Sequence, residues 1–362
     1  MEIVCGAVNY ADVMSDGARA SRLPTIGEVA ELAGVSKATV SRAFTQPHRL
    51  SARTVGLVHE VAARLGYVPN LNARALRTGR QGAVALVVPD IANPFFPPLI
   101  RGAQARADQA GFSVLIGDSE ERADKEDDLV AKLAPQTDGF VIVSSRMSEV
   151  QIRRHAARRP VVLVNRDIEG LSRVLIDTAS GIAEAVSHLA ELGHRHIVYA
   201  GGPAASWSNH QRAKAIRRAG RRLGVKITAG PAQLSTYQAG RDAATALVES
   251  GATAAVAFDD LLAQGIMAGL AHLGVKVPQE FSVVGCDDVL GATTYPPLTT
   301  VSAHCADAGR SAVEMLLALL ADDARQEDAP ERRVQETRLV IRATTAAPTQ
   351  RAFADRKPAR RP

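Results

Sequence analysis

The side chains best placed to contact a partner are polar ones at helical spacing in residues 37–45, KATVSRAFT. In a helix, Val40 and Phe44 would share the inner face of this segment. The outer face would carry Lys37, Ala38, Ser41, Arg42 and Thr45. That face is polar and basic and otherwise carries small side chains, so it could approach a nucleic acid closely.

A second basic stretch follows at residues 70–77, NLNARALR. Arg74 and Arg77 suit phosphates, and Leu76 beside them is typical of a wedge inserted between base steps of a minor groove. An isolated helix of two turns is not stable in water, so this one would form only when DNA or another partner completes it. The spacing alone favours the alternative, a flexible linker with an incidental leucine.

Two short helices around a glycine must position the outer face. Thr25 precedes an apolar stripe at i, i+3, i+4 and i+7, and Glu28 stands where it completes a reciprocal capping box with Thr25. Gly34 tolerates the left-handed conformation of a tight helix exit. Ser36 is placed to cap the second helix, and the valine before it is a candidate hydrophobic staple.

A third helix is predicted over residues 51–65, with a stripe of Val58, Val61, Ala62 and Leu65 and with Gly66 at its end. Three short helices with these stripes bury one small core, which is the helix-turn-helix plan. A generic helical hairpin with a solvated face is the alternative. The caps, the glycine turn and the basic outer face together favour the helix-turn-helix.

Charge is unevenly distributed along the 362 residues. Residues 21–80 hold nine Lys or Arg against three Asp or Glu, a local net charge of +6, so the remainder of a chain of net charge +5 nets about −1. A basic head on a nearly neutral body is expected of a DNA-binding module attached to a sensor. A chain of this length also exceeds one ordinary core and predicts at least two domains.

Short apolar runs alternate with helical patterns from Gly82 onward. Strands are predicted at 83–88, 113–117, 139–143, 161–164, 174–176, 196–200, 254–258 and 281–285, and helices near 99–110, up to 133, at 183–192, up to 223, at 239–248 and up to 273. This alternation predicts parallel sheets covered on both faces. Two sets of similar length indicate two Rossmann-like subdomains.

Ligands of such sheets bind outside the carboxyl ends of the strands. The residues that follow the predicted strands include Asp90, Asn93, Phe95, Phe96, Asn165, Arg166, Asp167, Ser206, Trp207, Ser208, Asn209, Arg212, Asp259, Asp260 and Asp287. Aromatic faces with carboxylates, amides and a guanidinium suit a sugar or a nucleoside. Packing remains the alternative for Trp207, a strand-end cap for Asp287, and a helix start for Asp259 and Asp260.

Other classes of function find little support. The three cysteines are widely separated, with no zinc spacing and no disulfide framework, which fits a reducing cytoplasm. No run reaches transmembrane length, and no catalytic or metal constellation stands out, so neither cofactor nor metal is expected. We interpret residues 1–22 as a disordered leader rather than a secretory signal, and residues 345–362 as a disordered basic tail.

Several quoted stretches resemble a known family. TIGEVAELAGVSKATVSRAF and GYVPNLNARALRTGRQGAVALVVPDIANPFF resemble the amino-terminal signature of the lac-repressor (LacI/GalR) family of bacterial transcription regulators. LAELGHRHIVYAGGP, VPQEFSVVGCDD and YPPLTTV follow in the family's order, so the similarity spans residues 24–344. The resemblance implies an all-α helix-turn-helix head at 23–68, a hinge helix and linker at 69–81, and an α/β periplasmic-binding-protein-like (type I) effector domain of two Rossmann-like subdomains at 82–344.

The resemblance also assigns roles to residues. It implies base-edge readers at Lys37, Ala38 and Arg42, phosphate contacts at Thr25, Ser36, Thr39, Ser41 and Thr54, and a minor-groove hinge with Asn70, Arg74, Leu76 and Arg77. It implies effector contacts at Asn93, Phe95, Phe96, Arg166, Trp207, Asn209, Arg212 and Asp287. The chain departs from the family at Thr45, where asparagine is common, and at Lys37, which replaces larger readers.

The expected protein is therefore a cytoplasmic regulator, a repressor without enzymatic activity. Two chains would pair on a palindromic operator, and a sugar or related polyol in the cleft would alter operator affinity through the hinge. The carboxyl end lacks leucine heptads, which predicts a homodimer rather than a tetramer. The alternatives are a nucleoside-responsive regulator, a solute receptor for transport, which would need an export signal, and an NAD-linked enzyme, for which Gly201-Gly202-Pro203 is a poor glycine-rich turn.

Overall fold

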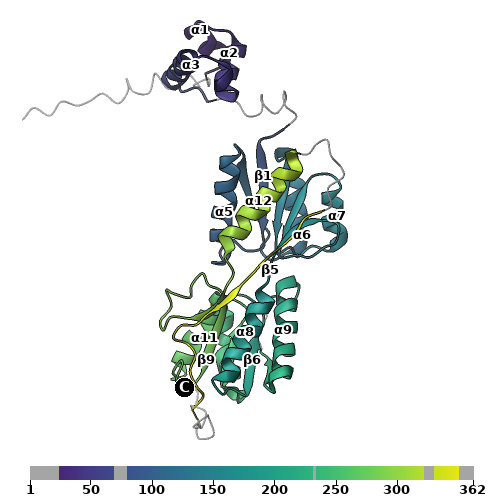
Figure 1. The fold of residues 1–362 in the computed structure, drawn as a ribbon, viewed down its shortest axis with the longest axis vertical. Helices are drawn as coiled ribbons and strands as arrows, with labels where there is room; N and C mark the ends of the chain where they lie inside the picture. Colours follow the sequence, from purple (N-terminus) through teal and green to yellow (C-terminus); the bar gives the residue numbers. More distant parts are fainter. Residues whose placement is uncertain (1–23, 69–79, 231–233, 322–329, 350–362) are drawn as a thin grey trace, which may run out of the picture. The chain divides into compact units, whose positions relative to one another are not determined.

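The computed structural model describes residues 24–68, 80–230, 234–321 and 330–349, which fall into two compact units divided at Gly79 (Figure 1). The first unit is the predicted helical head, and the second is the predicted α/β body. The hinge residues Asn70, Arg74, Leu76 and Arg77 lie outside the described residues.

The head consists of α1 (Ile26–Leu32), α2 (Lys37–Thr45), a 3₁₀ turn η1 (Pro47–Arg49) and α3 (Ala52–Leu65). The predicted capping box between Thr25 and Glu28 is confirmed, and Ser36 caps α2 by accepting from the Thr39 amide. Gly66 ends α3 in the left-handed conformation, as predicted. Eight small side chains close one core, Val29, Ala30, Ala33, Val40, Ala43, Val58, Val61 and Ala62. Larger side chains, including Phe44, Leu65 and Tyr67, pack against this core and remain partly exposed.

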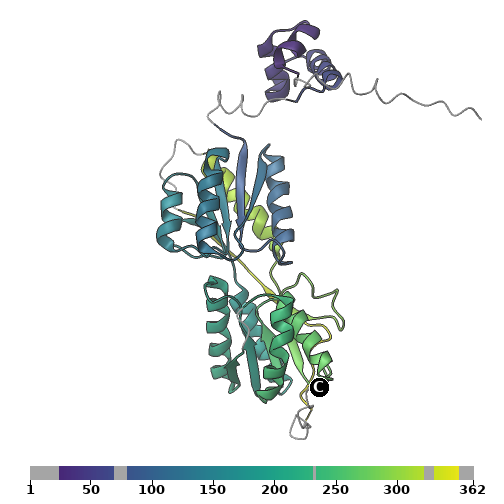
Figure 2. The same ribbon diagram turned by 180° about the vertical axis from the view of Figure 1, so that it is seen from behind.

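The body contains two six-stranded sheets, each with helices on both faces (Figure 1, Figure 2). The first lobe has strand order β11-β5-β4-β3-β1-β2 and the second lobe has β12-β10-β9-β8-β6-β7. All neighbouring strands run parallel except β10 and β12. The two Rossmann-like subdomains predicted from the sequence are thus confirmed.

The first lobe comprises β1 (Ala83–Val88), α5 (Phe96–Gln109), β2 (Ser113–Asp118), α6 (Ala123–Leu133), η2 (Ala134–Gln136), β3 (Gly139–Val143), α7 (Glu149–Ala156), β4 (Val161–Val164), β5 (Ser172–Ile176), α12 (Cys305–Ala321) and β11 (Arg332–Gln335). The second comprises α8 (Thr178–Glu191), β6 (His196–Ala200), α9 (Trp207–Leu223), β7 (Lys226–Ala229), α10 (Tyr237–Glu249), β8 (Ala254–Ala257), α11 (Asp260–His272), β9 (Ser282–Asp287), β10 (Thr299–Ser302) and β12 (Arg338–Val340).

The lobes are not two consecutive halves of the chain. The helix α12 and the strand β11 belong to the first lobe although they follow the second lobe in sequence, so the chain crosses between lobes three times. Neither α12 nor β11 was predicted from the sequence, and α7, β7, β10 and β12 were missed as well. The missed strands β7, β10, β11 and β12 have three or four residues each, which is too few for a periodic signal to stand out.

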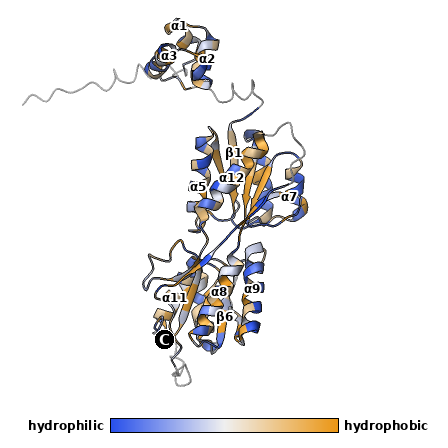
Figure 3. Ribbon diagram, viewed as in Figure 1, coloured by the Kyte–Doolittle hydropathy of each residue, from blue (hydrophilic) through white to orange (hydrophobic). Residues whose placement is uncertain are grey.

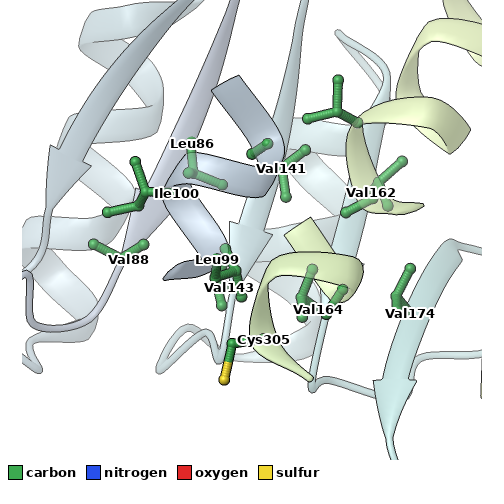
Figure 4. Close-up of a cluster of buried hydrophobic side chains, with 14 of the residues drawn as sticks. Leu86, Val88, Leu99, Ile100, Val141, Val143, Val162, Val164, Val174 and Cys305 are labelled. Carbon is green, nitrogen blue, oxygen red and sulfur yellow. The ribbon is translucent and has the colours of Figure 1, made fainter. Parts of the chain in front are cut away.

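Alternate side chains of the central strands fill two separate layers of the first lobe. Val84, Leu86 and Val88 of β1 face α5 and α12, whereas Ala85 and Val87 face the opposite layer. Figure 4 shows the first of these layers, and Figure 3 shows the apolar residues concentrated in the sheets. Burial on both faces explains why these strands read as continuous apolar runs.

The predicted tail begins too early. Thr344 is fully buried, and its hydroxyl donates to the Val283 carbonyl at 2.6 Å. The Ala346 amide donates to Ser282 Oγ at 3.1 Å, and its carbonyl bonds His194 Nε2 at 2.9 Å. Residues 345–349 therefore belong to the second lobe, because the Ala346 backbone is hydrogen-bonded to the side chains of His194 and Ser282. None of the helices in the described ranges is long and apolar enough to cross a membrane.

Candidate functional site

The outer face of α2 is exposed as the sequence predicted. Lys37, Ala38 and Arg42 are exposed, while Val40 is fully buried beneath them. Gly27 of α1 leaves room for the stem of Lys37, since a Cβ at Gly27 would lie 3.3 Å from Lys37 Cε. Lys37 and Ala38 lie in the first turn of α2, where backbone amides and the helix dipole favour anions, whereas Arg42 lies in the last turn.

Two of the predicted phosphate contacts, Thr25 and Ser36, already serve as helix caps, and Thr39 and Thr54 contact cap residues. Ser36 Oγ and Thr39 Oγ1 lie 2.9 Å apart, and Thr25 exchanges hydrogen bonds with Glu28. Thr54 Oγ1 lies 2.8 Å from the cap residue Ser51. These hydroxyls keep acceptor or donor capacity for a phosphate, because each carries two lone pairs and one proton. Ser41 is half-buried on the same side of α2 as Arg42.

The body contains a small cavity lined from both lobes. First-lobe residues on its wall include Asn93, Phe95 and Phe96, and second-lobe residues include Arg212 and Asp287. The structure therefore brings together five of the eight predicted effector contacts. Asn93 and Phe95 follow β1, Asp287 ends β9, and Phe96 and Arg212 lie in the first two turns of the helices that follow β1 and β6, as the sheet rule requires.

A buried ion pair forms the second-lobe wall. Arg212 Nη2 lies 3.3 Å from Asp287 Oδ1, and the two side chains are 3% and 4% exposed. Arg212 Nε donates to Thr178 Oγ1 at 2.9 Å and Nη1 donates to the Phe258 carbonyl, while the guanidinium lies 4.5 Å from the Phe258 ring centroid. Burial raises the pKa of the Asp287 carboxyl well above its ordinary value, and the Arg212 charge opposes this rise. Such a pair can accept from one ligand hydroxyl and donate to its neighbour.

One amide joins the lobes across the cavity. Asn93 Nδ2 donates to Asp259 Oδ2 at 2.9 Å and to Ser235 Oγ at 3.1 Å, and Asn93 Oδ1 accepts from the Phe95 amide. Asp259 also caps α11, which confirms its interpretation as a helix start, and it lines the cavity as well. These bonds connect the first lobe to the second at the wall of the cavity.

The first-lobe wall combines aromatic and charged groups. Phe95 and Phe96 meet edge to face with ring centroids 5.0 Å apart, which offers apolar surface for C–H groups. Arg146 Nε lies 2.5 Å from Glu121 Oε2, and both residues line the cavity. Five of the lining residues were not predicted from the sequence, namely Glu121, Ser144, Arg146, Ser235 and Phe258.

Backbone geometry marks the same site. Glu121, Ser144, Asn165 and Asp287 line the cavity and have φ of 60°, 48°, 53° and 111°, and they are four of the seven non-glycine residues with positive φ in the described ranges. Such conformations cost energy for residues other than glycine and cluster at functional sites. Each follows or ends a strand, so the chain turns sharply there and exposes polar groups to the cavity.

Three of the predicted effector contacts, Arg166, Trp207 and Asn209, are not among the residues that line the cavity. Ser208 and Arg212 lie one helical turn apart on the face of α9 that borders the cavity, and Trp207 is rotated away from them. Asn209 instead binds its own loop, accepting from the Gly202 amide and the Tyr199 hydroxyl. Arg166 Nη2 donates to the Met147 carbonyl at 3.3 Å.

Comparisons with known proteins agree with this arrangement. Residues 25–70 match the model of bacterial regulatory proteins of the lacI family, and residues 186–345 match that of a periplasmic binding protein-like domain. The chain is 31% identical to the HTH-type transcriptional repressor CytR of Escherichia coli K12, over 89% of this chain and 96% of CytR. It is 34% identical to catabolite control protein A of Streptococcus mutans, over 84% and 93%.

Solved structures match over the same span. The lac repressor dimer bound to operator and the anti-inducer ONPF aligns with a TM-score of 0.79 and 26% identity, covering 90% of this chain and all of the repressor chain. The complex of the regulator CelR with cellobiose aligns with a TM-score of 0.66 and 28% identity, covering 89% and 99%. Both matches extend over the head and the two-lobed body.

Proposed function

The chain belongs to the lacI family of bacterial regulatory proteins and is a DNA-binding transcriptional regulator, and from this premise we propose that it is a repressor controlled by a sugar or related polyol. A homodimer would bind a palindromic operator in the cytoplasm. The observation that carries the proposal is the cavity lined from both lobes, because a ligand held there can shift their closure.

The α2 helix would read the operator in the major groove. Arg42 is assigned to a guanine, whose O6 and N7 accept two parallel hydrogen bonds, worth about 1–3 kcal/mol of discrimination. Lys37 and Ala38 are assigned to neighbouring base edges. Thr25, Ser36, Thr39, Ser41 and Thr54 are assigned to phosphates, which fix the register of the helix without reading sequence.

Residues 69–79 are assigned to the minor groove at the operator centre. Leu76 would insert between base steps, and Asn70, Arg74 and Arg77 would contact the backbone beside it. Pairing of two chains would place two copies of this segment together. The proposal is supported here by the sequence resemblance alone.

The cavity chemistry supports a polyhydroxylated effector. Arg212 and Asp287 form a donor–acceptor pair suited to two neighbouring hydroxyls, and Phe95, Phe96 and Phe258 supply apolar surface. Two relatives of known structure hold sugars, CelR with cellobiose and a LacI-family regulator of Enterococcus faecium with ribose. The relatives are regulators and not enzymes, and we assign no catalysis to this chain.

Effector and operator binding would be coupled through lobe closure. The ligand must bind one closure state more tightly than the other, and a typical coupling changes affinity about 5- to 150-fold. By linkage, operator DNA changes the affinity for the ligand by the same factor. A ligand that binds both states equally would leave repression unchanged.

The test begins with duplexes selected from a random pool by the full-length protein. Fluorescence anisotropy at moderate salt then compares the selected inverted repeat with a scrambled duplex, with and without cellobiose or ribose. We expect tighter binding to the inverted repeat and a change in affinity with at least one sugar of a wider panel. Equal affinity for both duplexes would refute operator recognition, and an unchanged affinity across the panel would refute sugar control.

A further inference from the structure

The first-lobe wall of the cavity holds an ion pair that the proposed function does not require. Arg146 Nε and Nη2 donate to the two carboxylate oxygens of Glu121 at 2.5 and 2.9 Å, and Nη1 donates to the Ser144 carbonyl at 2.6 Å. The Arg146 side chain is 5% exposed and that of Glu121 is 33% exposed. A two-pronged contact of this kind is among the strongest polar interactions in proteins.

The fork of Arg146 is the part of the side chain that a phosphate would bind. A guanidinium offers the same pair of parallel N–H groups to carboxylate and to phosphate. Glu121 therefore occupies the position on Arg146 that the anionic group of a ligand would take. Without Glu121, the same wall would present an uncompensated cation to the cavity.

Both partners are fixed by their own loops. The Arg146 amide donates to Glu126 Oε2 at 2.7 Å, and Glu126 is buried. The Glu121 amide donates to the Pro89 carbonyl at 2.6 Å, and Glu121 has a φ of 60°. Because separate contacts hold each backbone, the pair is a built part of the wall rather than a chance meeting of long side chains.

Arg212, the second cation that lines the cavity, also has an anionic partner. Arg212 contacts Asp287, and Asp259 lies on the same wall. The charged residues that line the cavity are thus two arginines and three carboxylates. A buried anion is costly unless it gains a charged partner, and both arginines already have one.

We propose that the Glu121–Arg146 pair excludes anionic ligands, so that the cavity selects uncharged polyhydroxyl compounds over their phosphate esters. The choice of polyhydroxyl compounds rests on the proposed function. The exclusion of phosphate rests on the pair alone and can be tested without knowing the effector.

Glu121→Gln in the full-length protein keeps the size of the side chain and removes its charge, which frees Arg146 for another anion. Isothermal titration calorimetry with inorganic phosphate should show binding at least about tenfold tighter than in the unchanged protein, the equivalent of one charge-assisted hydrogen bond. Glu120→Gln is the matched control, because Glu120 pairs with the surface residue Lys125 at 2.6 Å and does not line the cavity. Adding Arg146→Gln to Glu121→Gln should remove the gain.

The same titration compares ribose with ribose 5-phosphate and glucose with glucose 6-phosphate. Equal phosphate affinity in the Glu121→Gln and unchanged proteins, with both folded by circular dichroism, would overturn the proposal. Tighter binding of a phosphate ester than of its parent sugar by the unchanged protein would overturn it as well. Gain of phosphate binding without any binding of neutral sugars would support the role of the pair and count against the sugar effector.

Discussion

Asp260 offers a direct test of how burial of a carboxyl in the second lobe affects the stability of the fold. Its side chain is fully buried at the start of α11, where Oδ1 accepts from Thr300 Oγ1 at 2.5 Å and Oδ2 accepts from the Val289 and Leu290 amides at 2.9 and 3.0 Å. Burial raises the pKa of this carboxyl from 3.8 to about 6, and these hydrogen bonds only partly offset the rise. Asp260→Asn preserves the shape and can keep all three contacts, with its amide donating to the Thr300 hydroxyl.

The direction of the pH effect on the unfolding free energy follows from the linkage between folding and protonation. A carboxyl whose pKa is higher in the folded protein resists ionisation there, so its penalty is absent below pH 3.8, grows up to about pH 6, and is then constant. At neutral pH the penalty amounts to about 3 kcal/mol, at about 1.4 kcal/mol for each pKa unit. Lowering the pH from about 7 to about 5 should therefore raise the unfolding free energy of the unchanged protein by about 1 kcal/mol relative to Asp260→Asn.

The assay is urea unfolding at both pH values, followed by the fluorescence of Trp207, the only tryptophan. Trp207 begins α9 and so reports on the lobe that contains Asp260. Asp307→Asn, at an exposed carboxyl of α12, controls for the general loss of one charge. The same pH dependence in the unchanged and Asp260→Asn proteins would refute the assignment of the penalty to Asp260.

Three further changes test other parts of the molecule. Arg42→Ala should lower discrimination between matched and mismatched operators by about 1–3 kcal/mol in anisotropy titrations; unchanged discrimination would remove its assigned role. Asp287→Asn should abolish the response of operator affinity to sugar while leaving affinity without sugar unchanged, and a retained response would contradict the cavity assignment. Gly102→Ala places a Cβ against the Ala306 carbonyl, where α5 and α12 cross, and should destabilise the first lobe by about 1–3 kcal/mol in thermal unfolding. Gly56→Ala is its control, because α3 is open there and the change should stabilise by about 0.5–1 kcal/mol; equal effects of the two would show that close packing is not the cause.

The head was largely predictable because its signals are local. Thr25, Glu28, Ser36 and Gly66 act within four residues of their partners, so a helix start or end can be read from a short window. The outer face of α2 follows from helical period alone.

The cavity was only partly predictable. The rule for strand ends selected Asn93, Phe95 and Asp287, which line the cavity, and it applies equally to Arg146 after β3, which was not predicted. The partner of Arg146 lies 25 residues away, and no spacing signals a pair of that separation.

Trp207 shows that a shift of one residue along a helix changes which side chains face the cavity. Successive residues of a helix point about 100° apart, so the face that Ser208 and Arg212 share cannot also include Trp207. Ser206 caps α9, and the sequence prediction had not located that start.

By itself the sequence determined the helical head, the alternation of strands and helices, and the family, because each depends on contacts between near neighbours or on a run of matching residues. Only the tertiary structure decided that α12 and β11 return to the first lobe and that Glu121 covers Arg146. Those arrangements arise from packing and charge pairing between segments far apart in the chain, and side chains that meet only after folding leave no periodic trace in the sequence.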